Sequence, residues 1–308
     1  LIAVFIMIYS VLNKKIKKTT FIYGLIIISL LDLVIVNLEF MNVKPASNLD
    51  RAFAKNPVIE FLEKNLGSSR IFPADRLGSN RYSYWNFGSI GGYRPIKLRN
   101  YQDLMDARGF SRPKVLDMLN VKYILTNKKI KNPNFIPVKN LKGIYENKNV
   151  LPKAWIVKNI KSVKTQKESL MEVLLSGFDP KTTAIILNYK GSEIPQESNG
   201  IVEINYLTEN KIELSSKSDT GGLLVLSEIF YQPGWKATIN GKDTPIYQTN
   251  HILRSIEIPE GDSEIIFRYD TSNWKNARFI SRSSFFLVLF GLFGLVWKEK
   301  NTIIKLKK

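Results

Sequence analysis

The sequence predicts a membrane protein in which transmembrane helices flank an extracytoplasmic α+β region that is followed by an antiparallel β-sandwich. Three observations lead to this fold class: apolar runs near both ends of the 308 residues, lysine clusters beside those runs, and short segments of alternating hydrophobicity after residue 200. A chain of this length is sufficient for two domains of ordinary size.

Three apolar runs predict membrane helices. Residues 21–41 (FIYGLIIISLLDLVIVNLEFM) and 279–297 (FISRSSFFLVLFGLFGLVW) are close to the ~20 apolar residues that cross a hydrocarbon core. Residues 1–12 (LIAVFIMIYSVL) form a shorter run that begins without Met and without a charged leader. We expect residues 1–12 to be a truncated transmembrane helix and the chain to be a fragment of a longer protein.

The lysines predict the orientation of these helices. The loop of residues 13–20 contains four lysines, and the tail of residues 298–308 contains five. Lys and Arg are enriched in cytoplasmic loops, so both segments are expected in the cytoplasm. This places residues 42–278 on the extracytoplasmic side of a multi-pass protein, with membrane lipid as a partner.

Composition excludes several classes of site. The net charge is +18, but a net eight of these charges lie in the two lysine-rich segments, and no nucleic-acid-binding signature occurs, so no nucleic acid is expected as a partner. The absence of cysteine excludes thiolate nucleophiles, disulfides and Cys-based zinc sites. One histidine, His251, makes a His-rich metal site unexpected. We therefore expect no metal and no cofactor in this chain.

Asp32 lies in the middle of the apolar run 21–41. An ionisable side chain at this depth is costly in a membrane and is a candidate functional residue. The alternative is a structural pair with a polar group on another helix. The sequence leaves both interpretations open.

Residues 42–199 form the expected α+β region, and residues 42–50 at its start are expected to be a linker. Apolar periodicity and flanking Gly and Pro residues predict its elements. The expected helices cover residues 56–66, 101–108, 113–119 and 166–175. The expected strands cover residues 70–76, 121–126, 135–138, 143–146, 154–157 and 184–187.

Residues 79–93 (SNRYSYWNFGSIGGY) are rich in aromatic residues, Gly and Asn and have no regular period, which predicts a loop. Its aromatic side chains are candidate contacts for a sugar ring: Tyr82, Tyr84, Trp85 and Tyr93. Aromatic rings also pack well in ordinary cores. Both readings of these four residues remain open.

After residue 200 the hydrophobic period changes to two, which is typical of strands with one buried face. The expected strands of the sandwich (residues 200–273) cover residues 201–207, 211–216, 223–230, 235–239, 244–247, 253–258 and 264–269. Asn240 and Gly241 predict a type I′ hairpin turn, because that turn needs positive φ at both central residues. We expect these strands to have a core of their own.

The corner at residues 231–235 (YQPGW) has two interpretations. In the first interpretation Trp235, which alternates with apolar residues along its strand, fills the core of the sandwich. Tyr231 and Trp235 are also candidate contacts for a carbohydrate ligand.

The stretch SEIFYQPGWKATINGKDTPIYQTNHILRSIEIPEGDSEIIFRY resembles the C-terminal signature of the YfhO family of bacterial membrane proteins. Two other segments, LDMLNVKYILT and IYENKNVLPKAWIV, and the loop around Gly92 and Tyr93 are also similar to the family. The signature residues in this chain are Tyr231, Pro233, Gly234, Trp235, Asn240, Gly241, Asn250, Pro259, Gly261, Phe267 and Tyr269.

The resemblance implies a polytopic GT-C-like glycosyltransferase of the bacterial cell membrane. Such an enzyme takes a sugar from a polyprenyl-phosphate carrier and transfers it to a cell-envelope glycan or lipid. The resemblance places the catalytic carboxylate in an early outer loop, so we expect the catalytic region to lie upstream of this chain. No catalytic residue is assigned here, and a divalent metal in the longer protein is left open. The alternative function is a non-catalytic carbohydrate-binding or structural module.

Overall fold

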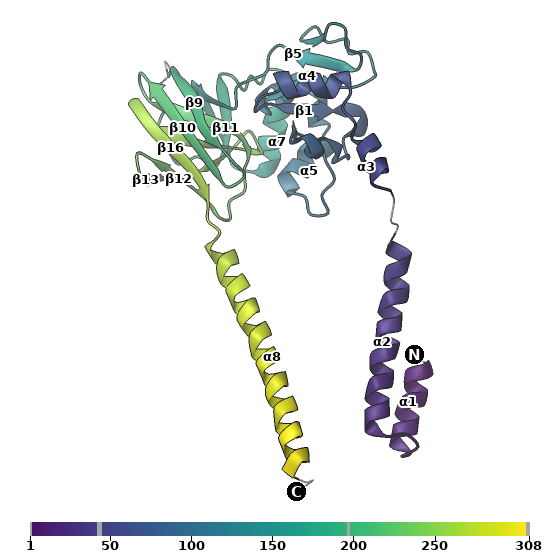
Figure 1. Cartoon of the computed structure of the whole chain (residues 1–308). Helices are drawn as coiled ribbons and strands as arrows, with labels where there is room; N and C mark the ends of the chain where they lie inside the picture. Colours follow the sequence, from purple (N-terminus) through teal and green to yellow (C-terminus); the bar gives the residue numbers. More distant parts are fainter. Residues whose placement is uncertain (1, 42–44, 196–197, 306–308) are drawn as a thin grey trace. The chain divides into compact units, whose positions relative to one another are not determined.

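The computed structural model describes residues 2–41, 45–195 and 198–305, and the predictions for residues 1, 42–44, 196–197 and 306–308 lie outside these ranges (Figure 1). The chain divides into two compact units, Leu1–Asn56 and Pro57–Lys308.

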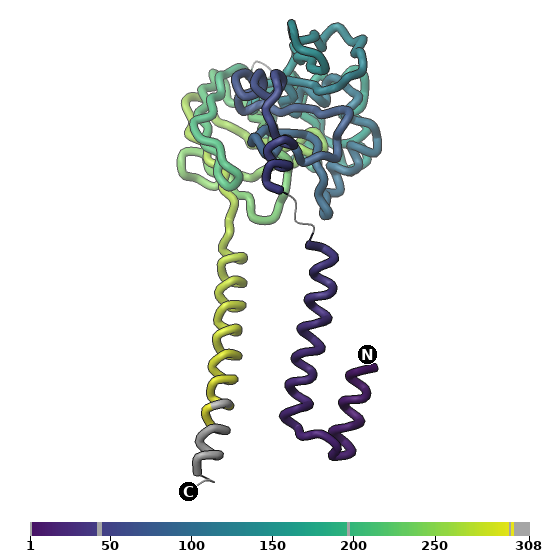
Figure 2. The backbone as a smooth tube through the Cα atoms, turned by 45° about the vertical axis from the view of Figure 1, so that its right-hand side comes forward, coloured from purple at the N-terminus to yellow at the C-terminus, as the bar shows by residue number. Residues whose placement is uncertain are grey.

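The first unit is helical. It contains α1 (Ile2–Leu12), α2 (Lys18–Phe40) and α3 (Ala46–Ala52). The chain reverses between α1 and α2, which lie side by side, as Figure 2 shows. The linker predicted at residues 42–50 is wrong in its second half, because Pro45 precedes a helical turn that continues to Ala52. Proline fixes φ near the helical value and is well tolerated at the start of a helix.

The second unit begins with a five-stranded sheet in the order β2-β1-β3-β5-β4. Its strands are β1 (Arg70–Pro73), β2 (Gly88–Ser89), β3 (Val121–Leu125), β4 (Phe135–Pro137) and β5 (Ile144–Asn147). The helix α4 (Pro57–Asn65) buries Leu62 against Ile71 and Tyr123 of this sheet. The predicted helices at residues 101–108 and 113–119 are confirmed as α5 (Arg99–Asp106) and α6 (Pro113–Met118).

A six-stranded sheet with the order β6-β11-β15-β14-β8-β7 joins the two halves of this unit. Its strands are β6 (Ala154–Val157), β7 (Asn159–Val163), β8 (Thr183–Leu187), β11 (Gly222–Ile229), β14 (Tyr247–Thr249) and β15 (Leu253–Ile258), and α7 (Gln166–Leu174) packs against β7 and β8. Strand β11 pairs with β6, whose residues precede position 200, with Leu223 opposite Val157.

The boundary predicted between residues 199 and 200 therefore does not separate two cores. The physical reason is the run GLLVLS in β11, which is buried on both faces. Leu223 and Val225 join a cluster with the preceding α+β elements, and Leu224 and Leu226 join a second cluster on the opposite face. A strand that is apolar on both faces must be covered on both faces.

A second five-stranded sheet, in the order β13-β12-β16-β10-β9, is antiparallel throughout. Its strands are β9 (Gly200–Leu207), β10 (Lys211–Ser218), β12 (Trp235–Ile239), β13 (Lys242–Thr244) and β16 (Gly261–Tyr269). Leu214 and Phe267 of this sheet share one buried cluster with Leu224 and Ile256 of the six-stranded sheet. The two sheets therefore face each other across a common apolar layer.

The turn at Asn240 and Gly241 is confirmed, with φ values of 50° and 78°. It connects β12 to β13, which pair antiparallel. The single strand predicted at residues 244–247 is wrong: β13 ends at Thr244 in one sheet and β14 begins at Tyr247 in the other. Pro245 lies at the crossing, where the absence of its N–H removes a ladder hydrogen bond.

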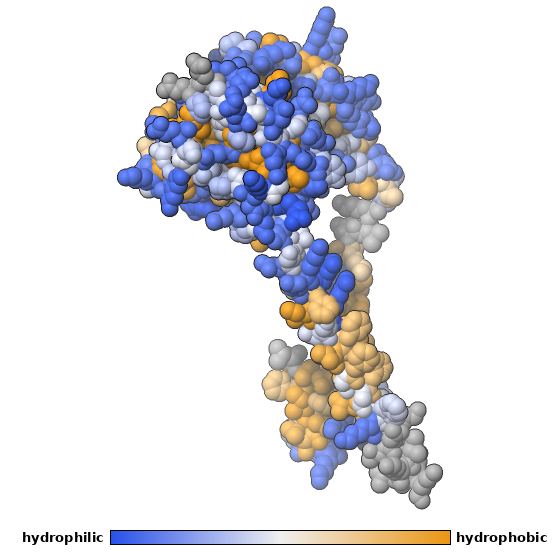
Figure 3. Space-filling model, turned by 90° about the vertical axis from the view of Figure 1, so that its left-hand side faces the viewer, coloured by the Kyte–Doolittle hydropathy of each residue, from blue (hydrophilic) through white to orange (hydrophobic). Residues whose placement is uncertain are grey.

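The chain ends in the long helix α8 (Ser272–Lys305), which begins earlier than the predicted span of residues 279–297. Only Asp270 and Thr271 separate it from β16, and the Asp270 carboxylate accepts a hydrogen bond from the Ser272 amide at 2.9 Å. By length and composition, α2 and α8 can each cross a membrane, and Figure 3 shows apolar side chains over these helices. Two apolar helices thus flank a β-rich region in the sequence.

We expect Gly234→Ala to lower the free energy of unfolding more than the matched control Gly241→Ala. Both glycines have positive φ, 88° and 78°, which costs an alanine roughly 1–2 kcal/mol. A Cβ at Gly234 would lie 2.7 Å from the Tyr269 ring, whereas a Cβ at Gly241 would meet nothing within 4 Å. Overpacking adds about 1–3 kcal/mol. Denaturant unfolding followed by tryptophan fluorescence measures the difference, and equal losses would contradict it.

Candidate functional site

The predicted aromatic residues Tyr82, Tyr84 and Trp85 lie together on the short helix η2 (Arg81–Trp85). Tyr82 is half-buried against the cluster beneath α4, and burial raises the pKa of its hydroxyl. The Trp85 ring lies 5.4 Å from the Tyr84 ring and 6.2 Å from the Phe87 ring. Most of this aromatic surface is therefore used in local packing, and Tyr84 remains the exposed member of the group.

Tyr93 lies outside that group, on the loop that precedes α5. Asn80 holds its main chain: the Asn80 Oδ1 accepts from the Tyr93 amide at 2.7 Å, and the Asn80 Nδ2 donates to the Tyr93 carbonyl at 3.0 Å. The Tyr93 ring is 66% exposed. The loop is thus fixed at its base while its aromatic ring faces solvent.

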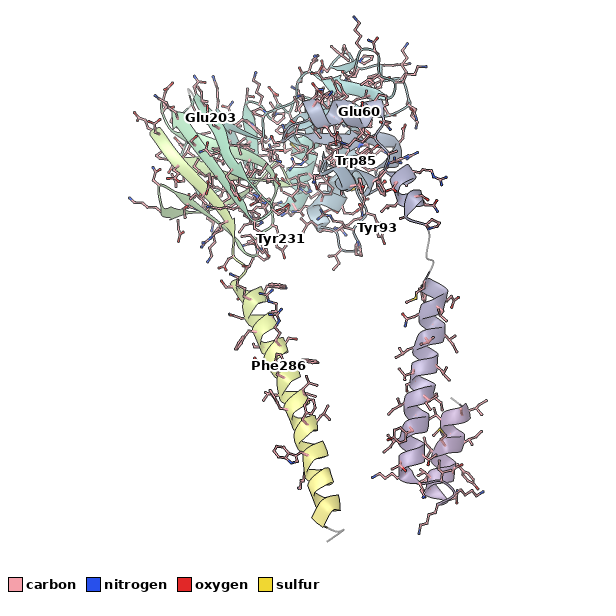
Figure 4. The ribbon with its side chains drawn as sticks, in the orientation of Figure 1. Glu60, Trp85, Tyr93, Glu203, Tyr231 and Phe286 are labelled. Carbon is pink, nitrogen blue, oxygen red and sulfur yellow. The ribbon has the colours of Figure 1, made fainter. Side chains whose placement is uncertain are left out.

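Tyr231 and Trp235 form a second aromatic site beside the start of α8. Gly234 makes the corner possible with a positive φ, and its carbonyl accepts from the Asp270 amide at 2.6 Å. Trp235 pairs with Tyr269 in the sheet, and their rings lie 5.7 Å apart. Figure 4 shows Tyr231 at the end of the folded region from which α8 leaves.

The corner borders a cavity of about 380 Å³. Its walls combine aromatic and apolar groups with a few polar side chains: Phe230, Tyr231, Gln232, Trp235, Lys236, Ala237, Asp243, Thr244 and Ile246. The buried Ala237 belongs to the apolar layer between the two facing sheets, so the cavity reaches the edge of that layer. Trp235 therefore packs against this core, as predicted, and it also lines the cavity, while its contact with a carbohydrate stays a prediction.

A cluster of buried charged groups lies behind Trp235. The Arg254 guanidinium stacks 4.2 Å from the centre of the Trp235 ring and donates to the Ile229 carbonyl at 2.6 Å. Its Nε and Nη1 find no hydrogen-bond acceptor among the described residues, although the side chain is only 4% exposed. The tryptophan ring offsets part of this cost, because its face attracts a cation.

Glu228 is the carboxylate at the centre of this charged cluster. The pairing of β11 with β15 shifts register between Leu226 and Ile229, so Ser227 and Glu228 form a bulge. Bulges redirect side chains, and here the carboxylate meets Arg70 at 2.9 Å and Lys153 at 2.5 Å. The Ser227 hydroxyl accepts from Arg70 at 3.0 Å and donates to the Met118 carbonyl at 2.8 Å.

The charged cluster carries three cations and one carboxylate. Burial and, to a smaller extent, the charge of Arg70 lower the pKa of Lys153 to about 8 and that of Arg254 to about 10. Burial acts to raise the pKa of Glu228, but the charges of Arg70, Lys153 and Arg254 outweigh it and hold that pKa below its usual value. Glu228 is therefore ionised at neutral pH and holds the cations in place.

A second cavity of about 240 Å³ lies on the other side of this charged cluster. Three cations, Arg70, Arg94 and Lys97, line it together with apolar residues such as Leu119 and Ile229. A smaller cavity of about 130 Å³ shares residues with both of its neighbours, Ile229 with the second cavity and Phe230 with the first. The three cavities thus follow one another along the end of β11.

The remaining candidates lie elsewhere. Asp32 is exposed on the surface of α2 in the first unit. His251 is 1% exposed in the turn between β14 and β15, and burial lowers its pKa. No group of three or more His, Cys, Asp or Glu side chains among the described residues is arranged to hold a metal ion.

Sequence reasoning missed Arg70, Lys153, Glu228 and Arg254. One local signal exists, the Ser-Glu pair that interrupts the apolar run of β11. The partners of this pair come from three other strands or strand ends, so no spacing in the sequence connects them.

We expect Glu228→Gln to destabilise the protein by about 3–5 kcal/mol, because it leaves three cations close together without a counter-charge. Lys153→Met is the matched control, since it removes one buried cation and leaves the contact between Arg70 and Glu228 intact. Denaturant unfolding of both variants measures the difference. A smaller loss in Glu228→Gln than in Lys153→Met would show that the carboxylate is not required.

We also expect the stability to depend on pH through Lys153. Its pKa is about 8 in the folded protein and 10.5 when unperturbed, so the unfolded chain binds more protons between these values. The contribution of this lysine to the free energy of unfolding therefore rises by about 3 kcal/mol from pH 8 to pH 10.5. The difference between the wild type and Lys153→Met isolates it, and parallel pH profiles would contradict the assignment.

Comparison with known proteins gives one match. The sequence model of the family described as "Bacterial membrane protein YfhO" matches residues 188–281, from the end of β8 to the first turns of α8. No curated protein matches the chain significantly, and no solved structure does. The aromatic corner, the Asn-Gly turn and the start of α8 all lie within the matched residues. The resemblance to this family of bacterial membrane proteins is thus confirmed over residues 188–281, whereas the similar segments LDMLNVKYILT and IYENKNVLPKAWIV lie outside the matched range.

Proposed function

We propose that this chain is part of a membrane glycosyltransferase and that its β-rich region positions the acceptor glycan at the outer surface of the cell membrane. The observation that carries the proposal is the cavity at Tyr231 and Trp235, which borders the entry to α8 within the residues that match the YfhO family. The two facing sheets serve as an extracytoplasmic β-sandwich in this proposal.

The orientation follows from charge. Lysines flank α2 at its start and follow the apolar part of α8, so both of these ends lie in the cytoplasm under the positive-inside rule. Residues 42–278, the range expected from the sequence, are then extracytoplasmic, and the chain crosses the membrane more than once. The acceptor is therefore a glycan or glycolipid of the cell envelope.

The cavity has the chemistry of a sugar-binding site. Ligand sites combine apolar walls with a small number of polar groups that fix orientation. Here Trp235 and Tyr231 supply aromatic surface, and Gln232, Asp243 and Thr244 supply hydrogen-bonding groups. Aromatic side chains bury large areas at a small cost in conformational entropy.

The position of the cavity suits a donor that stays in the lipid. A polyprenyl-phosphate sugar moves within the plane of the membrane, so an acceptor must be held close to that plane to react with it. Binding an acceptor beside α8 makes the encounter effectively intramolecular. In this proposal the chain supplies binding and orientation, and the carboxylate that performs the transfer lies in the upstream region of the longer protein.

The first test is glycan binding by the whole chain in lipid nanodiscs. We expect Tyr231→Ala to weaken binding of an envelope glycan about tenfold, within the range of a central aromatic contact. Tyr84→Ala is the matched control, because Tyr84 is an exposed tyrosine of another aromatic group. Equal effects of the two substitutions, or no binding by the wild type, would argue against the site.

The second test is transfer. Membranes that contain the longer protein are supplied with a labelled polyprenyl-phosphate sugar, and labelled envelope glycan is measured. We expect transfer to fall in Tyr231→Ala through a higher KM for the acceptor, with an unchanged response to the donor. Glycan binding without transfer would instead assign a non-catalytic carbohydrate-binding module.

A further inference from the structure

The loop of residues 93–98 (YRPIKL), here called the basic-apolar loop, exposes an unusual set of side chains. Tyr93 is 66% exposed, Ile96 is 88% exposed and Leu98 is 41% exposed. Arg94 and Lys97 alternate with them and are also exposed. Residues 91–102 contain Arg94, Lys97 and Arg99 but no carboxylate.

Single exposed apolar residues are common on soluble proteins, but three of them interleaved with cations in one short loop require a reason. Segments that lie in the membrane interface have this composition, with aromatic and aliphatic side chains between Lys and Arg residues. Apolar side chains enter the boundary of the lipid tails, and the cations meet the phosphates of the headgroups.

The basic-apolar loop adjoins the aromatic corner. Leu98 lines the small cavity of about 130 Å³ together with Ile229 and Phe230. The next residue, Tyr231, is 41% exposed. Figure 4 shows Tyr93 and Tyr231 along the same end of the folded region. The loop and the corner therefore form one edge.

This edge is connected directly to α8. Trp235 pairs with Tyr269, the last residue of β16, and only Asp270 and Thr271 lie between β16 and the helix. Two residues extend over at most ~7 Å. The first turn of α8 carries Trp274, which is 61% exposed with Arg278 stacked 4.4 Å from its ring centre. Tryptophan in this position is typical of the membrane interface.

We propose that the basic-apolar loop docks onto the bilayer surface, with Ile96 at the boundary of the lipid tails and with Arg94 and Lys97 on anionic lipid headgroups. The partner is a lipid surface that carries negative charge. This inference rests on the membrane crossing of α8 in the proposed function, and it adds a second, non-covalent attachment of the β-rich region to the membrane.

The chain contains no cysteine, so single-cysteine variants of the full chain can be spin-labelled at one site each. Ile96→Cys reports the loop. Ile201→Cys is the matched control: Ile201 is 68% exposed and lies opposite Lys217, at the end of the sheet farthest from Tyr269. Phe286→Cys, in the apolar part of α8, reports whether the helix is in the membrane.

Each labelled chain is placed in nanodiscs of zwitterionic lipid or of lipid with anionic phosphatidylglycerol. Collisions of the label with oxygen and with a water-soluble nickel reagent give its depth. We expect the label at residue 96 to be immersed in the anionic discs and the label at residue 201 to stay in water. Arg94→Gln and Lys97→Gln should each reduce the ratio of docked to undocked protein roughly fivefold, whereas Lys217→Gln should not change it.

The outcomes separate this inference from the proposed function. A label at residue 96 in water, with the label at residue 286 immersed, would overturn the docking and leave the membrane crossing intact. A label at residue 286 in water would overturn the crossing and the docking together. A label at residue 96 shielded from both reagents would indicate a protein partner instead, and equal immersion in both lipids would overturn the role of the two cations.

Discussion

The ion pairs of Glu228 hold together parts of the molecule that no local interaction connects. Arg70 reaches this carboxylate from the first five-stranded sheet, and Lys153 reaches it from the residue before β6. Arg254 lies on β15 and stacks on Trp235, which belongs to the antiparallel sheet. All three sheets are therefore linked through one bulge in β11. Because the buried cations Lys153 and Arg254 depend on the charge of this partly exposed carboxylate, the cluster restrains how the sheets meet.

The charged cluster contains more cations than carboxylates, and this surplus makes the electrostatic potential beside the aromatic corner positive. Three cations beside one carboxylate leave a positive potential at the end of β11, between the cavity at Trp235 and the cavity lined by Arg94 and Lys97. The Arg254 cation is stabilised by the face of the Trp235 ring and not by a carboxylate of its own. An acidic ligand would therefore be attracted to this end of β11.

Much of the local structure could be predicted from the sequence, because its causes are local. The Asn-Gly turn, the helix α4 and the alternation in β12 each depend on a few neighbouring residues. The division at residue 200 could not be predicted correctly, because the apolar character of both faces of β11 indicates two partners without identifying them. The division of residues 244–247 between two strands could not be predicted either, because it depends on which sheet each strand joins. Among the candidate ligand contacts, Tyr231 and Trp235 line a cavity, whereas Tyr82 and Trp85 are used in packing. The charged cluster could not be predicted, because its members are distant in the sequence: Arg70 and Glu228 are 158 positions apart.

The strand order of the antiparallel sheet has a consequence for biosynthesis. Its central strand, β16, comes after the other four strands of this sheet in the sequence, and both β10 and β12 need it as a partner. During synthesis these two strands are made first and wait with unpaired edges, which are prone to mispair with other chains. The sheet closes only after Tyr269 has left the ribosome, when part of α8 has already been synthesised. Closure of this sheet and synthesis of α8 thus overlap in time, and a ribosome that pauses after most of α8 has been made gives the sheet time to close.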